Sequence, residues 1–107
     1  MTEQRKTPAG PYSIGSDHWP GVSKLIEESG EVLQTLGKLI AVNGAKKHWD
    51  GSKLDARLGE ELADLLAAID FVIAHNGGLD QQAIRRRHAE KLDQFNAWYR
   101  DWQKEQP

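Results

Sequence analysis

The sequence contains no cysteine among its 107 residues. This absence excludes disulfide bonds, thiol catalysis and cysteine-ligated zinc or iron–sulfur centres, and it fits a reducing cytoplasm. There is also no large excess of either charge. The formal net charge is -2, so neither nucleic acid nor a membrane surface is expected as a general partner. No apolar run approaches the roughly 18 residues of a membrane helix, and the polar N-terminus lacks a signal-peptide core. We therefore expect one small cytoplasmic domain.

Residues 1–19 are poor in apolar side chains and carry several prolines and glycines, which predicts an irregular N-terminal arm. A helical domain is expected over residues 20–104. Residues 105–107 are polar and form a short tail.

Three segments show the spacing of apolar residues that is typical of amphipathic helices. They cover about 21–42, 54–75 and 81–104, and no segment alternates as a strand does. The expected boundary residues are Pro20 in the first turn of the first helix, Asn43-Gly44 at its end, Gly77-Gly78 after the second helix and Asp80 as the cap of the third. The sequence therefore predicts an all-α fold, an antiparallel bundle of three long helices joined by short loops.

Each helix has an apolar face that should form the core. In the first helix this face comprises Val22, Leu25, Ile26, Val32, Leu33, Leu36, Leu39 and Ile40. In the second it comprises Leu58, Leu62, Leu65, Leu66, Ile69, Val72 and Ile73, and a further flank is formed by Ala67, Ala68 and Phe71. A helix that is apolar on two flanks needs more than one partner, so we expect the bundle to be completed in a homodimer or homotetramer.

Two groups of acids occur in nearly repeated surroundings on the first two helices. Glu28 and Glu31 are three residues apart, as are Glu61 and Asp64, so each pair shares one helix face. Antiparallel packing would bring all four carboxylates into one small volume, where they cannot stay ionised without a strong positive charge. Glu27 also belongs to the first group, but its position on the helix is closer to solvent.

This arrangement predicts a site for a hard cation. Carboxylates without cysteine, and without a Glu-x-x-His motif, favour Mg²⁺, with Mn²⁺ as a substitute. Small residues between the acids, Gly30 and Ala63, would let the helices or a substrate come close. The alternative is that the acids are solvated surface, or hold a structural cation in a non-catalytic interaction module.

The pattern Glu27-Glu28-x-x-Glu31 followed by Glu61-x-x-Asp64 on consecutive helices resembles the all-α nucleoside triphosphate pyrophosphohydrolases of the MazG-like family. The resemblance covers about His18 to Arg100. It implies a Mg²⁺-dependent hydrolase that cuts a nucleoside triphosphate into the monophosphate and pyrophosphate. Phosphoribosyl-ATP pyrophosphohydrolase belongs to the same superfamily. The resemblance therefore also allows phosphoribosyl-ATP as a substrate.

The resemblance also implies roles for individual residues. Glu28, Glu31, Glu61 and Asp64 correspond to the magnesium ligands, and Glu27 to an acid that acts through water or orients the nucleophile. All five are therefore candidate catalytic residues.

Three further residues are candidates for binding the substrate. Lys91 projects from the apolar stripe of the third helix, with Arg87 one turn earlier, and both could hold phosphates. The alternative for Lys91 is an extended side chain that reaches solvent. Trp19 could stack on a base, although tryptophan in a small helical protein more often closes a core.

Overall fold

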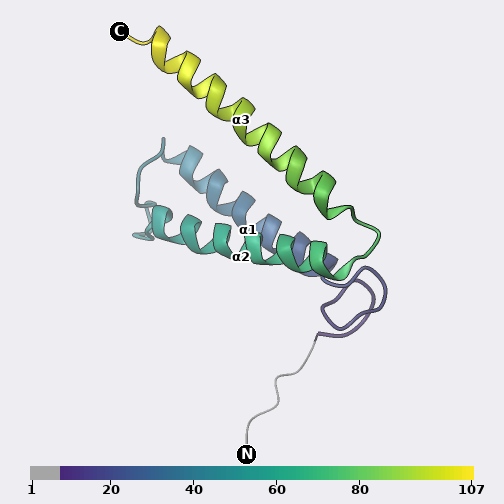
Figure 1. Ribbon diagram of the computed structural model, residues 1–107. Coiled ribbons are helices and arrows are strands. Elements are labelled where there is room, and N and C mark those ends of the chain that lie inside the picture. The colour runs from purple at the N-terminus through teal and green to yellow at the C-terminus, as the bar shows by residue number, and fades with distance from the viewer. Residues whose placement is uncertain (1–7) are drawn as a thin grey trace, which may run out of the picture. The chain divides into compact units, whose positions relative to one another are not determined.

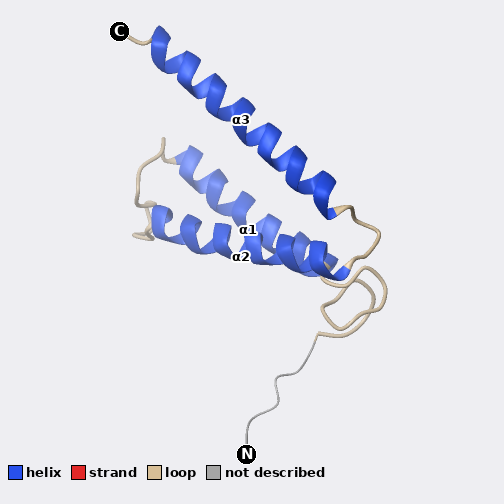
Figure 2. Ribbon diagram, in the orientation of Figure 1, coloured by secondary structure: helices blue, strands red, loops and turns tan. Residues whose placement is uncertain are grey.

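The computed structural model describes residues 8–107, which contain three helices and no strand (Figures 1 and 2). The helices are α1 (Val22–Ala41), α2 (Leu54–His75) and α3 (Gln81–Glu105). The all-α prediction is confirmed, and each helix boundary lies within about two residues of its expected position. The chain divides into two compact units, of which the first ends at Asn76 and the second is Gly77–Pro107.

The first unit is built on the antiparallel hairpin of α1 and α2, which lie side by side (Figure 1). Hydrogen bonds close both ends of this hairpin. At one end the Asn76 side chain, which is buried, donates to the carbonyl oxygens of Val72 at 2.7 Å and Pro20 at 3.1 Å. At the other end the Leu54 amide donates to the Lys46 carbonyl at 2.7 Å. The Asn76–Pro20 bond joins the end of α2 to the start of α1, and the Leu54–Lys46 bond joins the start of α2 to the loop after α1. Together they fix the register of α1 against α2.

The α1 helix begins at Val22 and not at the expected Pro20 or residue 21, because Gly21 has a left-handed backbone (φ 87°) that a helix cannot include. Pro20 therefore precedes the helix. Gly21 also lies directly against α2: a Cβ there would lie 2.5 Å from the Phe71 ring. Only glycine satisfies both the backbone angle and this contact.

The segment before α1 is irregular, as expected, and residues 1–7 of the predicted arm lie outside the described part of the chain. From Pro8 onward it folds back on itself. The Gly15 amide donates to the Pro8 carbonyl, and the Ser23 amide in α1 donates to the Tyr12 carbonyl. This segment is thereby joined to the first turn of α1.

The connection between α1 and α2 begins at Asn43 and Gly44, both of which have left-handed backbones (φ 54° and 78°). The Gly44 amide donates to the Leu39 carbonyl at 2.8 Å and so satisfies one of the last free acceptors of α1. The expected end of this helix is confirmed.

The core between α1 and α2 is small. Its fully buried side chains are Leu54 and Thr35, and its other buried apolar residues are Val32, Ala68 and Val72. The expected core face of α1 is wrong in part, because Ile26, Leu33 and Ile40 are 68, 67 and 76% exposed. Helical periodicity identified one broad apolar arc, whereas a single neighbouring helix covers only one side of it.

The α3 helix starts at its expected cap, where the Asp80 carboxylate accepts a hydrogen bond from the Ala83 amide at 3.0 Å. None of its residues is buried, although it carries a row of large apolar side chains. This row comprises Leu92, Phe95, Trp98, Tyr99 and Trp102. Among the described helices, none combines the length and the apolar character needed to cross a membrane.

Candidate metal centre

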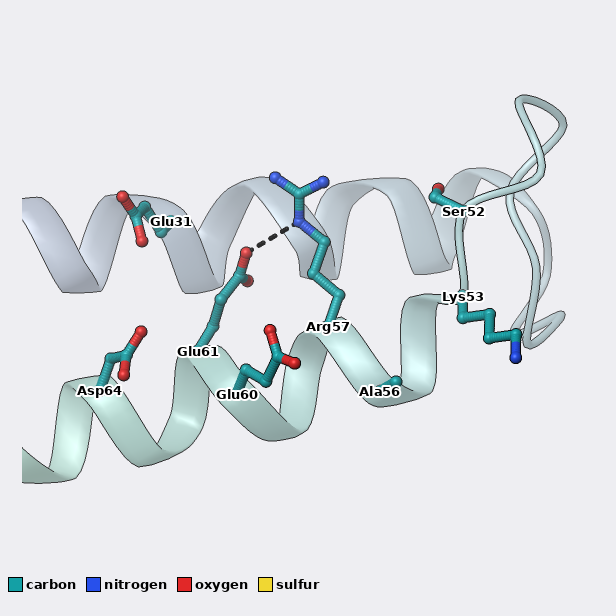
Figure 3. A pocket seen from close by; sticks show the side chains of 8 residues that line it. All are labelled: Glu31, Ser52, Lys53, Ala56, Arg57, Glu60, Glu61 and Asp64. Atoms are coloured by element: carbon teal, nitrogen blue, oxygen red, sulfur yellow. Dashed lines mark hydrogen bonds and ion pairs between the residues drawn. The ribbon is translucent and has the colours of Figure 1, made fainter.

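The register of the hairpin brings the two groups of acids together. Glu31 projects from α1 toward α2, and Glu61 and Asp64 project from α2 toward α1 (Figure 3). Carboxylate oxygens of Glu28, Glu31 and Asp64 all lie within 4.8 Å of one another. We call these residues the three-acid cluster. Oxygens that share one cation at about 2.1 Å lie at most about 4.2 Å apart, so acids separated by up to 4.8 Å need only a small side-chain movement to bind one ion.

Burial and charge both act on Glu28 within this cluster. Its Oε2 atom is buried and has no hydrogen-bond partner. Burial raises the pKa of the Glu28 carboxyl above its ordinary value, and the negative charges of Glu31 and Asp64 raise it further. The expected mutual repulsion of the acids is thus present at Glu28, and a cation between the carboxylates would relieve it.

Glu61 departs from the expected geometry. The sequence predicts four acids around one site, but Glu61 is not within the three-acid cluster. Its Oε1 atom instead accepts a hydrogen bond from Arg57 Nε at 3.0 Å, one turn earlier on α2 (Figure 3). Its Oε2 atom is buried without a partner, and the side chain is only 9% exposed. A local ion pair on α2 has therefore taken the place of the expected contact with the other acids.

A polar pocket of about 470 Å³ lies on the Glu61 side of the cluster. Acids occupy one part of its lining, and the cations Lys53 and Arg57 occupy another (Figure 3). The complete lining is Glu31, Ser52, Lys53, Ala56, Arg57, Glu60, Glu61 and Asp64. Opposite charges side by side in one pocket suit a ligand that carries both phosphates and a divalent cation.

The loop before α2 positions the cationic part of this pocket. The Asp50 carboxylate accepts hydrogen bonds from the Ser52 hydroxyl at 2.6 Å and the Ser52 amide at 2.9 Å. These bonds lower the pKa of Asp50 to about 2, so this carboxylate stays ionised and the turn that precedes Lys53 is kept.

An apolar pocket of about 320 Å³ lies on the Glu28 side. Its lining is Ile14, Lys24, Glu28, Asp64, Ala67, Ala68 and Phe71. Asp64 lines both pockets, so an extended ligand that contacts Asp64 could place a polar part in one and a flat apolar part in the other. The expected apolar flank of α2 therefore faces this pocket.

The remaining predicted site residues are not members of the three-acid cluster. Glu27 is exposed and pairs with Lys24 at 3.1 Å, which matches its expected position near solvent. Trp19 lies before α1, about half exposed, and lines neither pocket. Arg87 and Lys91 belong to α3, where they contact Glu90 at 3.8 Å and Gln94 at 3.5 Å respectively.

Gly30 does not bring the helices together, contrary to one of the two uses expected of it. A Cβ at Gly30 would meet no atom within 4 Å, so the space beside it is open.

The sequence analysis did not identify Lys53 and Arg57 as residues that line the polar pocket. Arg57 had a signal, because an arginine four residues before a glutamate on a helix can reach it.

The donor set fits a hard divalent cation. All the candidate ligands are carboxylate oxygens, and two buried oxygens, Glu28 Oε2 and Glu61 Oε2, lack any partner within the described residues. Buried carboxylate oxygens without partners are costly, and a bound cation would satisfy them.

Comparison of the chain with models of known protein families, with curated proteins and with solved structures finds no match.

Proposed function

We propose that this protein is a Mg²⁺-dependent nucleoside triphosphate pyrophosphohydrolase, the activity implied by its resemblance to the MazG-like family. The observation that supports this proposal best is the convergence of Glu28, Glu31 and Asp64 from two helices, with oxygens within 4.8 Å of one another. A fold gains nothing from assembling like charges in this way, because each such contact is repulsive. A bound cation would offset the repulsion between these carboxylates and so account for their arrangement.

The chain's own residues divide the work of the proposed reaction. Glu28, Glu31 and Asp64 would hold the cation, and Glu61, on the wall of the same pocket, would be the fourth ligand. When bound, Mg²⁺ supplies neutralisation of phosphate charge and a lowered pKa for a coordinated water. A carboxylate oxygen left free of the cation takes the proton of the attacking water, which reacts at the α-phosphorus and displaces pyrophosphate. Glu27 orients that water from the solvent side.

The two pockets provide for the rest of the substrate. Lys53 and Arg57 place positive charge where a phosphate chain would extend from the three-acid cluster. The apolar pocket over Ala67 and Phe71 offers a surface for the nucleoside. Arg87 and Lys91 are proposed as further phosphate contacts and Trp19 as a stacking residue. We propose that the enzyme acts on the cytoplasmic nucleotide pool as a homodimer or homotetramer.

Pyrophosphate release from a panel of nucleoside triphosphates, with and without Mg²⁺, tests the proposal. We expect release that requires Mg²⁺ and falls at least about a hundredfold in Glu31→Gln, which removes a charge at nearly constant shape. Asp70→Asn is the matched control, since Asp70 is an exposed acid of α2 that lines neither pocket. Phosphoribosyl-ATP belongs in the panel as the second substrate class.

Two outcomes would contradict the proposal. Release of orthophosphate in place of pyrophosphate would indicate a different phosphohydrolase. No release from any substrate, combined with stabilisation by Mg²⁺, would favour the non-catalytic module with a structural cation.

A further inference from the structure

Glu61 is held by one cation of the chain and only at one of its two oxygens. Arg57 Nε donates to Oε1 at 3.0 Å, while Oε2 is buried and makes no hydrogen bond. The two side chains differ in environment: that of Glu61 is 9% exposed and that of Arg57 is 48% exposed. A buried carboxylate is thus neutralised by a guanidinium that can readily move into solvent.

The energetic balance of this pair favours its exchange for a stronger cation. A buried ionised carboxylate is costly unless it is paired, so in the cation-free protein Glu61 needs Arg57. The half-exposed position of Arg57 weakens the ion pair through solvent screening. Because Glu61 Oε2 has no partner, part of the free-energy cost of burying the carboxylate remains uncompensated. A divalent cation beside Glu31 and Asp64, which line the same pocket, would offer Glu61 twice the charge.

We propose that Arg57 is an internal counter-ion that neutralises Glu61 in the cation-free protein and is displaced when Glu61 joins the three-acid cluster around a divalent cation. This inference rests on the proposed cation site. Arg57 is then a positioning residue that acts through Glu61, and the strength of its ion pair sets the affinity of the site. The polar pocket of about 470 Å³ that Arg57 itself lines gives the released side chain room to move (Figure 3).

Removal of Arg57 should therefore tighten cation binding. In Arg57→Gln the cation can bind Glu61 without first displacing Arg57 from it. The variant also has one positive charge fewer near the site. We expect the full-length variant to bind Mn²⁺ about tenfold more tightly than the wild type at pH 8, as measured by the electron paramagnetic resonance signal of free Mn²⁺.

Lys24→Gln is the matched control for general electrostatics. Lys24 is half-buried, lines the apolar pocket beside Glu28 and pairs with Glu27 at 3.1 Å. Its replacement removes one positive charge near the cluster without freeing a ligand. We expect its affinity to change no more than about threefold, because exposed pairs are weak and screened. Equal tightening in both variants would overturn the exchange and leave only a general effect of charge.

A double-mutant cycle separates exchange from a purely structural role of Arg57. In a Glu61→Gln background there is no carboxylate to release, so adding Arg57→Gln should change Mn²⁺ affinity by no more than about threefold, the general effect of one lost charge. Melting temperature gives a second measurement. Arg57→Gln should melt below the wild type without Mn²⁺ and approach it at saturating Mn²⁺, whereas a structural contact would lower both melting temperatures equally.

Arg57→Lys covers the case in which Arg57→Gln does not fold. Lysine keeps the charge but lacks the Nε donor, and its Mn²⁺ affinity should exceed that of the wild type by a few-fold. Wild-type affinity in a folded Arg57→Gln or Arg57→Lys variant would overturn the inference alone. A wild-type protein that binds no Mn²⁺ at ten-millimolar levels would instead refute the cation site itself, and with it the proposed function.

Discussion

At the residue scale, the surroundings of Glu28 oppose the ionised form of its carboxyl. Its carboxyl lies against Glu31 and Asp64 with one buried oxygen unpartnered, and its pKa is raised by burial first and by those charges second. Deprotonation of Glu28 at neutral pH therefore weakens the fold in the absence of a cation. The same negative charge is what a divalent cation would bind.

The raised pKa of Glu28 makes stability depend on pH in a defined direction. Its stabilising contribution is fully present below the ordinary value of 4.5 and is lost as pH rises through the raised value in the folded protein. Without a divalent cation, Glu28→Gln should therefore raise the melting temperature at pH 7, and the variant's melting temperature should fall less than that of the wild type between pH 4.5 and pH 7. Thermal melts by circular dichroism at both pH values measure this.

A bound divalent cation should make the ionised form of Glu28 stabilising. Mg²⁺ at a hundredfold excess over Kd would stabilise the wild type by about 2.7 kcal/mol, and the gain should be small in Glu28→Gln. Glu27→Gln is the control, because Glu27 is exposed and its partner is Lys24 outside the three-acid cluster. A wild-type melt that ignores Mg²⁺ would count against the site, and an equal response of both variants would count against the role of Glu28.

At the scale of the helices, the acids meet because the ends of the hairpin fix its register. The acids themselves repel one another and cannot supply that alignment. It comes from Gly21 against Phe71 and from the hydrogen bond of the Asn76 side chain to the Pro20 carbonyl. Apolar contact and backbone geometry at the helix ends thus stabilise an arrangement in the middle that charge alone would oppose.

Gly21→Ala tests this account of the register. The substitution combines a left-handed backbone (φ 87°) with a Cβ only 2.5 Å from the Phe71 ring, so we expect a loss of about 1–3 kcal/mol in unfolding free energy. Gly37→Ala is the matched control within α1, where a Cβ meets no atom within 4 Å. It should stabilise by about 0.5–1 kcal/mol, because alanine is the better helix former. Urea unfolding of both variants gives the comparison, and equal losses would contradict the proposed contact.

At the scale of the whole molecule, many large apolar side chains of the described residues are exposed, and the core is small. Ile26, Leu33 and Ile40 follow one another at intervals of seven residues along α1, and all are exposed. Leu62 and Leu66 are exposed on α2 as well. Such a stripe resembles the seam of a helical bundle more than a solvated face, which supports the proposed self-association.

Leu33→Glu should disrupt that association. It places a charge at the centre of the α1 stripe, where burial in an interface would be costly. We expect light scattering to give at least twice the chain mass of 12.0 kDa for the wild type and a value near 12.0 kDa for the variant at micromolar concentration. Gln34→Glu adds the same charge one residue away on an exposed polar position and should leave the assembly unchanged. A monomeric wild type would refute self-association.

The sequence by itself determined the helices and the spacing of the acids. Both are local properties: apolar periodicity, the Asp80 cap and Asn43-Gly44 act within a few residues, and residues three apart on a helix share a face whatever surrounds them. The all-α fold and the pairing of Glu28 with Glu31 on one face followed from this.

Only the tertiary structure decided how deep each acid lies and what it contacts. It placed three acids in one cluster and turned the fourth, Glu61, to Arg57. It also left Ile26, Leu33 and Ile40 exposed although they share the apolar arc with Val32. Helical periodicity gives the direction of a side chain but not the distance to the neighbouring helix. That distance depends on contacts between residues far apart in sequence, such as Gly21 with Phe71 and Pro20 with Asn76.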